Sequence, residues 1–471
     1  MGPPVDPIGK SRYLLDAAPA RVALSRAPPA EALGEGGLEV FMRKHSAVVI
    51  TAIVAFAGGL FAAMTTLSVY SQAQSGSGFA AVPGEKGGWD ITGPYDVVRD
   101  WPKPLSQLPG HDQWTWGAGE ALFAEKADRV FFIQMGELPK LTRPPVTALP
   151  QIGPSLSFPV GEVPFRHASQ GQYASPPGGG APGADPDDPA QAYKGRPGID
   201  SRWEHLVLVF NRNGDIVEQW TQWDKMLRRP HAVYISPYDP NKYVWIVDDH
   251  NHAIFKFSHD GKQLLQTIGT VGQKGADATH FNRPTFMTFL PDGTMFVSDG
   301  YNGNRVVKFD KTGKYVIAWG ERGNPPNETR PGYFNVVHGI AADPMTRRVY
   351  VSDRGNRRMQ VFDENGKFVD QWPFNNPSSV NFVYANGDGA IWAFEDPTAK
   401  VVKYDREGHL LYAWGGLGDY PGGFLNMHGA SVDPDGNLYI AEVGNGRIQK
   451  FTPRRGARPE LLVGKPPVPR S

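Results

Sequence analysis

The sequence predicts an all-β protein built as a six-bladed β-propeller, and two observations carry this prediction. From about residue 90 to residue 455 one pattern recurs: an apolar run, a turn, a second run that ends in Asp or Glu, a polar loop, and a run that ends in Phe or Tyr. The 471 residues also include 55 Gly and 43 Pro, which fits many short strands joined by tight turns.

The clearest repeat begins at His338. It predicts the four antiparallel strands of one blade, at residues 338–343, 349–353, 359–363 and 367–372. Four further repeats begin near His231, Thr285, Ser379 and His428. The first blade along the chain is assembled from residues 116–121, 129–134, 206–210 and 216–220, with a long insertion at 136–202. This insertion contains a Gly/Pro-rich stretch, so we expect it to lack a fixed structure.

Tryptophan ends the fourth predicted strand of four blades, at Trp220, Trp319, Trp372 and Trp414. Because fourth strands lie on the outside of a propeller, we expect these side chains to pack between blades rather than to bind a ligand. The arginines that recur in equivalent loops, Arg305, Arg358 and Arg447, are interpreted as structural ties.

The predicted propeller, residues 90–455, is flanked by segments of different composition. Residues 1–46 are rich in Ala, Pro and Gly and predict no fold, and residues 71–89 form a linker. Residues 47–70 are uncharged and apolar, and these 24 residues, at about 1.5 Å each, can span a bilayer core of about 30 Å. We expect a transmembrane signal anchor or a signal peptide there, and a C-terminal tail at 456–471.

Basic residues on one side of the apolar run predict its orientation. Arg43 and Lys44 precede the run and no basic cluster follows it, so the positive-inside rule places the propeller outside the cytoplasm. We expect an exported protein, periplasmic or extracellular, that stays anchored in the membrane through residues 47–70 or is secreted after cleavage near Ala73. Met42 is an alternative start of the chain.

Charge balance and the lack of cysteine exclude several functions. Lys plus Arg and Asp plus Glu number 48 each, and no basic stripe is interleaved with aromatic residues, so we expect no nucleic-acid partner. The chain has no cysteine, which excludes disulfides, thiolate nucleophiles and Cys-bound zinc. A metal would have to bind to His, carboxylate or carbonyl groups. We expect the propeller to be a monomer.

Three histidines share one position of the repeat. His231, His338 and His428 start the first strand, which lines the central pore, in the second, fourth and sixth blades, whereas Thr285 and Ser379 start it in the third and fifth. Alternate blades of a six-fold ring bring three imidazoles to one ion. Three neutral imidazoles with a vacant fourth position fit catalytic zinc best, with iron, cobalt and copper as alternatives. The interpretation without a metal is hydrogen bonding across the pore.

Two loop residues on the same face are candidates for catalysis. The loop at 299–305 is one residue longer than its counterpart at 353–358, which pushes Tyr301 outward. Because a nearby cation favours the deprotonated phenol, Tyr301 could take a proton from a substrate. Arg354 has no counterpart in the other blades and suits a peptide or small-molecule substrate that carries a carboxylate. The alternatives are a packed surface aromatic and an ordinary salt bridge.

Several stretches resemble a known family, the peptidyl-α-hydroxyglycine α-amidating lyases, which are six-bladed propellers related to NHL repeat proteins. These stretches are residues 229–231, 280–285, 297–309, 337–338, 352–354 and 427–428. The resemblance covers about residues 200–453, and Ser298-Asp299-Gly300-Tyr301 is its most specific stretch. It implies a metal-dependent lyase that splits the C–N bond of an α-hydroxyglycine-type carbinolamide into an amide and glyoxylate. It also implies the roles of the site residues: zinc ligands His231, His338 and His428, catalytic Tyr301, substrate-site Arg354, and Met427 close to the metal and the substrate.

The sequence departs from this family at several positions. Gly429 stands where the family has an aspartate, which puts a structural calcium ion in doubt, and Asn302 stands where it has a cysteine. Two other functions therefore stay open. One is a membrane-tethered propeller that binds proteins without chemistry. The other is a lactonase-like hydrolase, which we expect to line its pore with Glu, Asp and Asn around calcium, residue types absent from the predicted starts of the first strands.

Overall fold

The computed structural model describes residues 91–140, 195–324, 328–374, 377–385 and 387–464. The predicted N-terminal segment, the apolar run at 47–70 and the linker at 71–89 lie outside these residues, as does the middle of the predicted insertion. Within the described ranges, no helix is long and apolar enough to cross a membrane.

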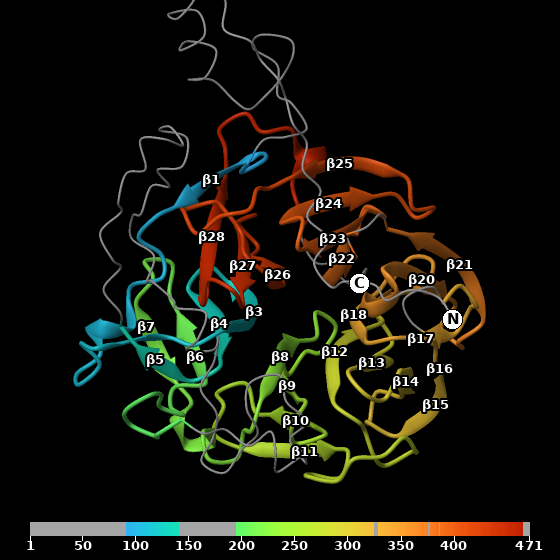
Figure 1. The fold of residues 1–471 in the computed structure, drawn as a ribbon, viewed down its shortest axis with the longest axis horizontal. Helices are drawn as coiled ribbons and strands as arrows, with labels where there is room; N and C mark the ends of the chain where they lie inside the picture. Colours follow the sequence, from blue (N-terminus) through green and yellow to red (C-terminus); the bar gives the residue numbers. More distant parts are fainter. Residues whose placement is uncertain (1–90, 141–194, 325–327, 375–376, 386, 465–471) are drawn as a thin grey trace, which may run out of the picture. The chain divides into compact units, whose positions relative to one another are not determined.

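The described residues form a six-bladed propeller, as the sequence predicts: six antiparallel sheets of four strands surround a central axis (Figure 1). The first blade contains β3 (Gly119–Lys126), β4 (Arg129–Gln134), β6 (Val207–Phe210) and β7 (Ile216–Gln219). The second contains β8 (Pro230–Ile235), β9 (Val244–Asp248), β10 (Ala253–Phe257) and β11 (Leu264–Ile268). The third contains β12 (Pro284–Phe289), β13 (Met295–Asp299), β14 (Arg305–Phe309) and β15 (Tyr315–Trp319). The next two are β18 (Val337–Ala342), β19 (Val349–Asp353), β20 (Arg358–Phe362) and β21 (Phe368–Pro373), and β22 (Ser379–Ala385), β23 (Ile391–Asp396), β24 (Lys400–Tyr404) and β25 (Leu410–Trp414).

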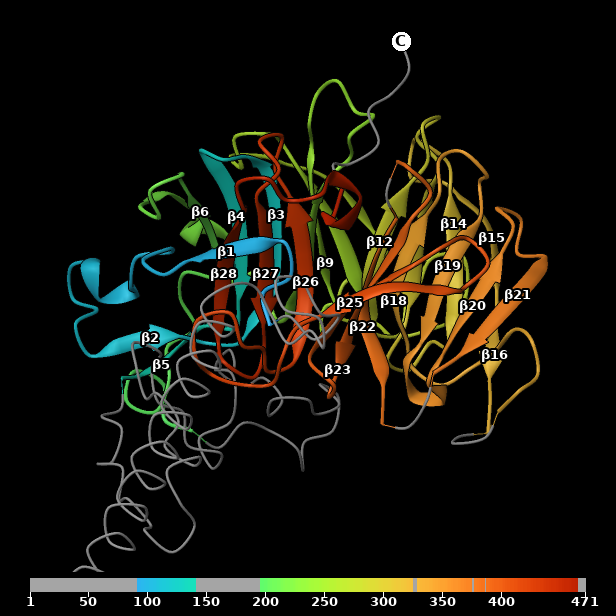
Figure 2. The ribbon, with the colours of Figure 1, turned by 90° about the horizontal axis from the view of Figure 1, so that it is seen from above.

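The sixth blade joins the two ends of the described chain. It contains β26 (Met427–Val432), β27 (Leu438–Glu442) and β28 (Arg447–Pro453), and its outer strand is β1 (Tyr95–Val98), which pairs with β28 (Figure 2). The hydroxyl of Tyr95, a buried side chain, accepts a hydrogen bond from the backbone N–H of Val463 at 2.8 Å. The ring is thus closed by a strand that sequence reasoning did not place.

Burial along the strands follows from the stacking of blades. The middle strand β9 is buried along its whole length, because neighbouring blades cover both of its faces, whereas the outer strand β11 is mostly exposed. The terminal tryptophans pack between blades, as expected. Each contacts an aromatic side chain of the next blade, in the pairs Trp220–Phe257 (5.8 Å between ring centroids), Trp319–Phe362 (5.8 Å), Trp372–Tyr404 (5.9 Å) and Trp414–Phe451 (5.9 Å).

The first blade differs from its sequence prediction at two points. Its first strand is β3, which begins at Gly119, and Trp116 belongs instead to β2 (Trp114–Trp116). This short strand pairs with β5 (Glu137–Pro139), so the first residues of the predicted insertion are ordered. A bridge between Glu137 and Arg202 ties the two ends of the insertion together.

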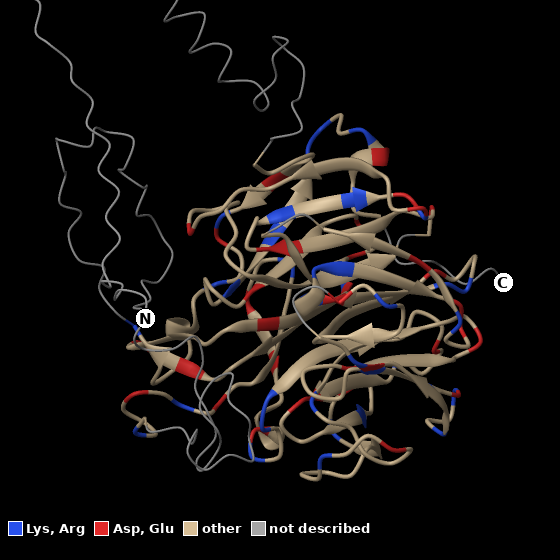
Figure 3. Ribbon diagram, turned by 45° about the vertical axis from the view of Figure 1, so that its right-hand side comes forward, with Lys and Arg blue, Asp and Glu red and all other residues tan. Residues whose placement is uncertain are grey.

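The remaining short elements lie in connecting segments. They are the strands β16 (Glu321–Arg322) and β17 (Tyr333–Phe334) and the 3-10 turns η2 (Leu105–Gln107), η6 (Thr221–Trp223), η7 (Arg354–Asn356) and η8 (Pro459–Leu461). Acidic and basic residues are intermixed over the strands and turns (Figure 3).

Candidate metal centre

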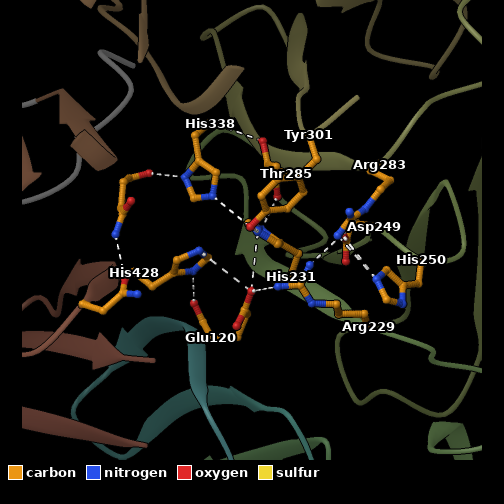
Figure 4. A network of polar contacts seen from close by, with 12 residues as sticks. Glu120, Arg229, His231, Asp249, His250, Arg283, Thr285, Tyr301, His338 and His428 are labelled. Atoms are coloured by element: carbon orange, nitrogen blue, oxygen red, sulfur yellow. Dashed lines mark hydrogen bonds and ion pairs between the residues drawn. The ribbon is translucent and has the colours of Figure 1, made fainter. Parts of the chain in front are cut away.

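The first strand of every blade departs from regular pairing near its start. These register shifts leave one or two residues out of the ladder: Glu120 in β3, His231 in β8, Thr285 and Phe286 in β12, His338 and Gly339 in β18, Asn381 in β22 and His428 in β26. A bulge of this kind re-aims a side chain without ending the strand. The same irregularity in all six blades gathers one set of side chains in the pore (Figure 4).

Two of these pore residues differ from the sequence prediction. Ser379 was predicted to hold the pore position of the fifth blade, but Asn381 holds it, because Ser379 and Val380 both pair with β23 and Asn381 is the residue that the register shift leaves unpaired. Glu120 holds the position in the first blade, where no residue was predicted. The expectation that these positions lack Glu and Asn was therefore wrong.

The three histidines are held by the backbone of the next blade around the ring. The distances from Nδ1 to a carbonyl oxygen are 3.0 Å for His231 and Thr285, 2.7 Å for His338 and Asn381, and 2.8 Å for His428 and Glu120. A carbonyl oxygen can only accept, so each Nδ1 carries the proton and each Nε2 presents a lone pair. Backbone carbonyls orient metal-bound histidines in the same way.

The imidazoles converge and are neutral. One ring nitrogen of each histidine lies within 4.8 Å of the others, and all three side chains are buried. Burial lowers the pKa of His428 to about 3, and burial together with neighbouring positive charge lowers the pKa values of His231 and His338 well below the ordinary value. Neutral imidazoles whose Nε2 atoms carry lone pairs are the form that binds a metal, so these residues fit the group that the sequence predicts.

Tyr301 lies directly against the histidines. Its hydroxyl is 3.1 Å from Nε2 of His231 and 3.2 Å from Nε2 of His338. The guanidinium groups of Arg229 and Arg283 lie 5.4 and 4.6 Å from the centre of its ring. Tyr301 is therefore held at the centre as the sequence predicts, and is not a loose surface aromatic.

Arg229 and Arg283 are neutralised by a buried carboxylate. Asp249 lies 2.8 Å from Arg229 and 2.9 Å from Arg283. Burial acts to raise the pKa of Asp249, but the two guanidinium groups and His250 hold it at about 2, so the carboxylate is charged. Arg229 and Arg283 can therefore pack against Tyr301 while each keeps Asp249 as its carboxylate partner.

Arg354, at the start of η7, reaches the same centre. Its Nη1 donates to Nε2 of His338 at 3.0 Å and to Oδ1 of Asn381 at 3.4 Å. These polar partners are an imidazole and an amide, and among the described residues the predicted alternative of a simple salt bridge is not found. Met427, the other predicted substrate residue, is buried in the apolar core and precedes His428 in β26, and its substrate contact stays a prediction.

A phenylalanine that sequence reasoning missed packs against all three histidines. The ring of Phe286 lies 4.9 Å from that of His231, 5.2 Å from His338 and 5.4 Å from His428. Further along the same first strands lies an apolar pocket, lined among others by Met287 and Ile340. Phe286 thus separates the polar end of the pore from its apolar end. The sequence did offer one signal for Phe286, because it directly follows Thr285, the residue predicted to start the first strand of the third blade.

A second group of metal-binding residue types lies at the base of the insertion, where His111, Glu137, Glu204 and His205 approach one another. Its two histidines share one carboxylate partner. The buried carboxylate of Glu137 accepts from Nδ1 of His111 at 2.8 Å and from Nδ1 of His205 at 2.7 Å. Burial acts to lower the pKa of His205, but the hydrogen bond and charge of Glu137 outweigh it and raise the pKa. This group clamps the ends of the insertion.

The fold and the site define a class: a six-bladed propeller with three converging, neutral histidines in its pore. The NHL repeat matches residues 424–451. NHL repeat-containing protein 3 of Mus musculus is 31% identical over 277 residues, which cover 54% of this chain and 74% of that protein. The chain belongs to the NHL repeat proteins, and it is homologous to the peptidyl-α-hydroxyglycine α-amidating lyases.

Two relatives carry names of amidating enzymes. Peptidyl-alpha-hydroxyglycine alpha-amidating lyase 1 of Drosophila melanogaster is 29% identical over 255 residues, which cover 50% of this chain and 46% of the fly protein. Peptidylglycine alpha-amidating monooxygenase of Rattus norvegicus is 28% identical over 260 residues, 53% of this chain and 26% of the rat protein. The chain therefore spans about a quarter of the rat protein and less than half of the fly protein.

Proposed function

We propose that this protein is a metal-dependent lyase that splits the C–N bond of an α-hydroxyglycine-type carbinolamide into an amide and glyoxylate. The observation that carries the proposal is the contact of the Tyr301 hydroxyl with Nε2 of both His231 and His338, at 3.1 and 3.2 Å. A tyrosine hydroxyl is thus placed beside converging metal-binding nitrogens, where its phenolate form can accept a proton. The homology to amidating lyases supports the same reaction.

His231, His338 and His428 would hold the metal through Nε2, and zinc is the ion that three neutral imidazoles favour. When bound, the metal supplies Lewis acidity at the substrate hydroxyl. Tyr301 accepts the hydroxyl proton through Oη. As the C–O bond becomes a carbonyl, the C–N bond breaks and its electron pair goes to nitrogen. Nitrogen then takes up the proton that Tyr301 accepted, which restores the phenolate, and the products are an amide and glyoxylate.

Arg354 is proposed to bind the carboxylate of the substrate. Arg229 and Arg283 are neutralised by Asp249, whereas Arg354 has no carboxylate partner in the described part of the chain. A planar guanidinium binds a carboxylate through two parallel hydrogen bonds, which also fixes the orientation of the substrate. We place Met427 beside the substrate on the basis of the family resemblance alone.

We further propose that the reaction takes place outside the cytoplasm, by a monomeric propeller. The proposal rests on the apolar run at residues 47–70 and on the basic residues before it, which predict an anchored propeller, or a secreted one if cleavage occurs near Ala73. Labelling of intact cells with a membrane-impermeant reagent that reacts with exposed lysines tests this location. Protection of the propeller in intact cells, lifted only on lysis, contradicts it.

Release of glyoxylate from an N-acyl-α-hydroxyglycine tests the reaction. Tyr301→Phe removes the proton acceptor and keeps the ring, so kcat should fall roughly 100- to 10,000-fold while the metal content stays that of the wild type. Tyr315→Phe, in the outer strand β15, is the matched control and should keep full activity. The proposal fails if the metal-loaded wild type releases no glyoxylate, or if Tyr301→Phe is as active as the wild type.

One observation favours a second function. The mouse NHL repeat-containing protein 3, whose name states no reaction, shows higher identity and greater coverage than the fly lyase. A membrane-tethered propeller that binds a partner protein without chemistry is therefore the alternative. In that case His231→Ala leaves partner binding intact and the wild type shows no lyase activity.

A further inference from the structure

We propose that Glu120 is a fourth protein ligand of the metal, so that the centre is a three-histidine, one-carboxylate site for a divalent transition-metal ion with five or six ligands. This inference rests on the proposed metal site and adds a residue to it. It follows from where Glu120 lies, from its lack of partners and from its spacing to the histidines.

Glu120 occupies the same place in its blade as each histidine does in its own. It is the residue left out of the ladder at the start of β3, as His231 is in β8 and His428 is in β26. Its side chain is completely buried, and its Oε1 lies 3.5 Å from Nε2 of His231 and 3.8 Å from Nε2 of His428. The carboxylate thus points at the same space as the imidazole lone pairs (Figure 4).

The carboxylate lacks the donors that a buried charge requires. Its Oε2 has no hydrogen-bond partner among the described residues, and Oε1 has one long contact, 3.5 Å from Nη2 of Arg229. Arg229 has a shorter contact with Asp249, at 2.8 Å. The facing Nε2 atoms of His231 and His428 carry lone pairs, so they cannot donate to it. An unpaired buried carboxylate is strongly unfavourable, and a cation between it and the histidines removes the conflict.

The spacing suits a shared ion. Two ligands that are each about 2.1 Å from one metal lie about 3.0 Å apart at right angles and about 3.4 Å apart in a tetrahedral arrangement. The distances of 3.5 and 3.8 Å from Oε1 to Nε2 of His231 and of His428 require only a small contraction. Glu120 lies farther from His338, outside the 4.8 Å within which the three histidine nitrogens approach one another, so its side chain must move closer to share one ion with all three. Carboxylate oxygen is also a common zinc and iron ligand beside imidazole.

A fourth protein ligand changes which ion and geometry the centre favours. Four-coordinate zinc with four protein ligands is a closed, structural site, whereas catalysis needs an open position. A centre that binds Glu120 and a substrate hydroxyl together therefore has at least five ligands. The carboxylate also reduces the net charge of the bound ion and its four ligands from +2 to +1.

Metal affinity of the full chain, measured by competition with a chelator, tests the proposal. Glu120→Gln keeps the length of the side chain and removes its charge, and Glu120→Asp keeps the charge and shortens the reach by about 1.5 Å. Both should weaken zinc binding, Glu120→Gln by more than about 100-fold, since loss of an indirect supporting residue already weakens binding by about 10- to 100-fold. A purely electrostatic role predicts weaker binding in Glu120→Gln alone, and that result overturns the proposal.

A matched control is Glu395→Gln, the same substitution at a buried glutamate of the fifth blade. Glu395 is bonded to Thr398 and Tyr404 and to none of the three histidines, so zinc affinity should stay that of the wild type. If Glu395→Gln weakens binding as much as Glu120→Gln, the effect is not ligation and the proposal fails.

Thermal unfolding gives a readout that does not depend on activity. Burial raises the pKa of Glu120 to about 7, so the comparison is made at about pH 8.5, where the carboxyl is charged. Without metal at this pH, Glu120→Gln should raise the Tm, because its amide can donate to the imidazole lone pairs where the carboxylate cannot. With zinc present, the rise in Tm should be smaller for the variant than for the wild type. A metal-free variant that is less stable than the wild type overturns the argument from unpaired charge.

Cobalt replacement separates this inference from the proposed function. Wild type loaded with Co²⁺ should show the weak visible absorption of five or six ligands, and Glu120→Gln should show the stronger absorption of fewer ligands. Identical cobalt spectra and zinc affinities for the wild type and Glu120→Gln overturn the role of Glu120 and leave the lyase proposal standing. A folded wild type that binds neither metal overturns both.

Discussion

Glu120 and His428 approach each other at two points. The carbonyl oxygen of Glu120 accepts the Nδ1 proton of His428 at 2.8 Å, and Oε1 of the same residue lies 3.8 Å from Nε2. One residue therefore fixes which nitrogen of His428 is free and places a carboxylate beside that nitrogen. Thr285 and Asn381 hold the other two histidines by their carbonyl groups but bring no charge. The three imidazoles are held in the same way, but only one of the three residues that hold them, Glu120, adds a charged group to the centre.

Removal of one histidine should remove most of the stabilisation by metal. At zinc concentrations about 100 times the Kd, the wild type should gain about 2.7 kcal/mol in the free energy of unfolding. His231→Ala should lose most of this gain and bind zinc more than about 100-fold more weakly. His409→Ala, at an exposed turn, is the control. Equal stabilisation of His231→Ala and the wild type by zinc contradicts the ligand assignment.

Arg354→Lys should raise KM for a substrate that carries a carboxylate. The substitution replaces a planar two-pronged donor by a single ammonium group. Loss of a charge-assisted hydrogen bond, worth about 1.5–3 kcal/mol, corresponds to a KM roughly 10- to 100-fold higher. Metal content should not change, and an analogue with a neutral amide in place of the carboxylate should be used about equally by both proteins. An unchanged KM for the carboxylate substrate argues against this role.

Phe286 should contribute to stability and to the shape of the centre. Phe286→Ala leaves a cavity beneath three histidines and should reduce the free energy of unfolding by about 3–5 kcal/mol, measured by urea denaturation. Phe286→Leu fills more of the space and should reduce it less. Both variants keep the three Nε2 atoms, so each should still bind one metal ion. Near-normal stability of Phe286→Ala shows that the ring is not tightly packed there.

The clamp formed by His205 and Glu137 should make stability depend on pH. The pKa of His205 is raised in the folded protein, so protonation favours folding. Its contribution is fully present below the unfolded pKa of about 6.5 and is lost as the pH rises through the folded pKa. Urea unfolding of the wild type and His205→Gln between about pH 5.5 and 8.5 should therefore give a difference that shrinks with rising pH. A difference that is constant or grows with pH refutes the clamp.

The blades could be predicted from sequence because each carries its own local pattern. Apolar runs, Asp-Gly turns and terminal tryptophans recur, and the structure places them as four-stranded blades with tryptophans between them. The closing strand β1 could not be found in this way. Tyr95–Val98 pairs with β28 across more than 350 residues of sequence, and no local pattern records that pairing.

The three histidines could be predicted because they too follow the repeat, whereas Glu120 and Asn381 could not. The three histidines recur at one repeat position. Glu120 was missed because the first blade departs from the repeat: Trp116, which was predicted to begin its first strand, belongs to β2, and the insertion separates β4 from β6. Asn381 was missed because the fifth blade's bulge lies one residue after Val380, and the count from the repeat start gave Ser379. Aligning blades by the bulge, which depends on backbone pairing, finds all six positions.

Metal content of the folded chain tests the central claim most directly. Wild type and the triple variant His231→Ala, His338→Ala, His428→Ala are incubated with zinc, freed of excess ion and analysed for metal, with circular dichroism to confirm folding. The account predicts one zinc ion per wild-type chain and none in the triple variant. A folded wild type without bound metal, or a triple variant that retains it, contradicts the account.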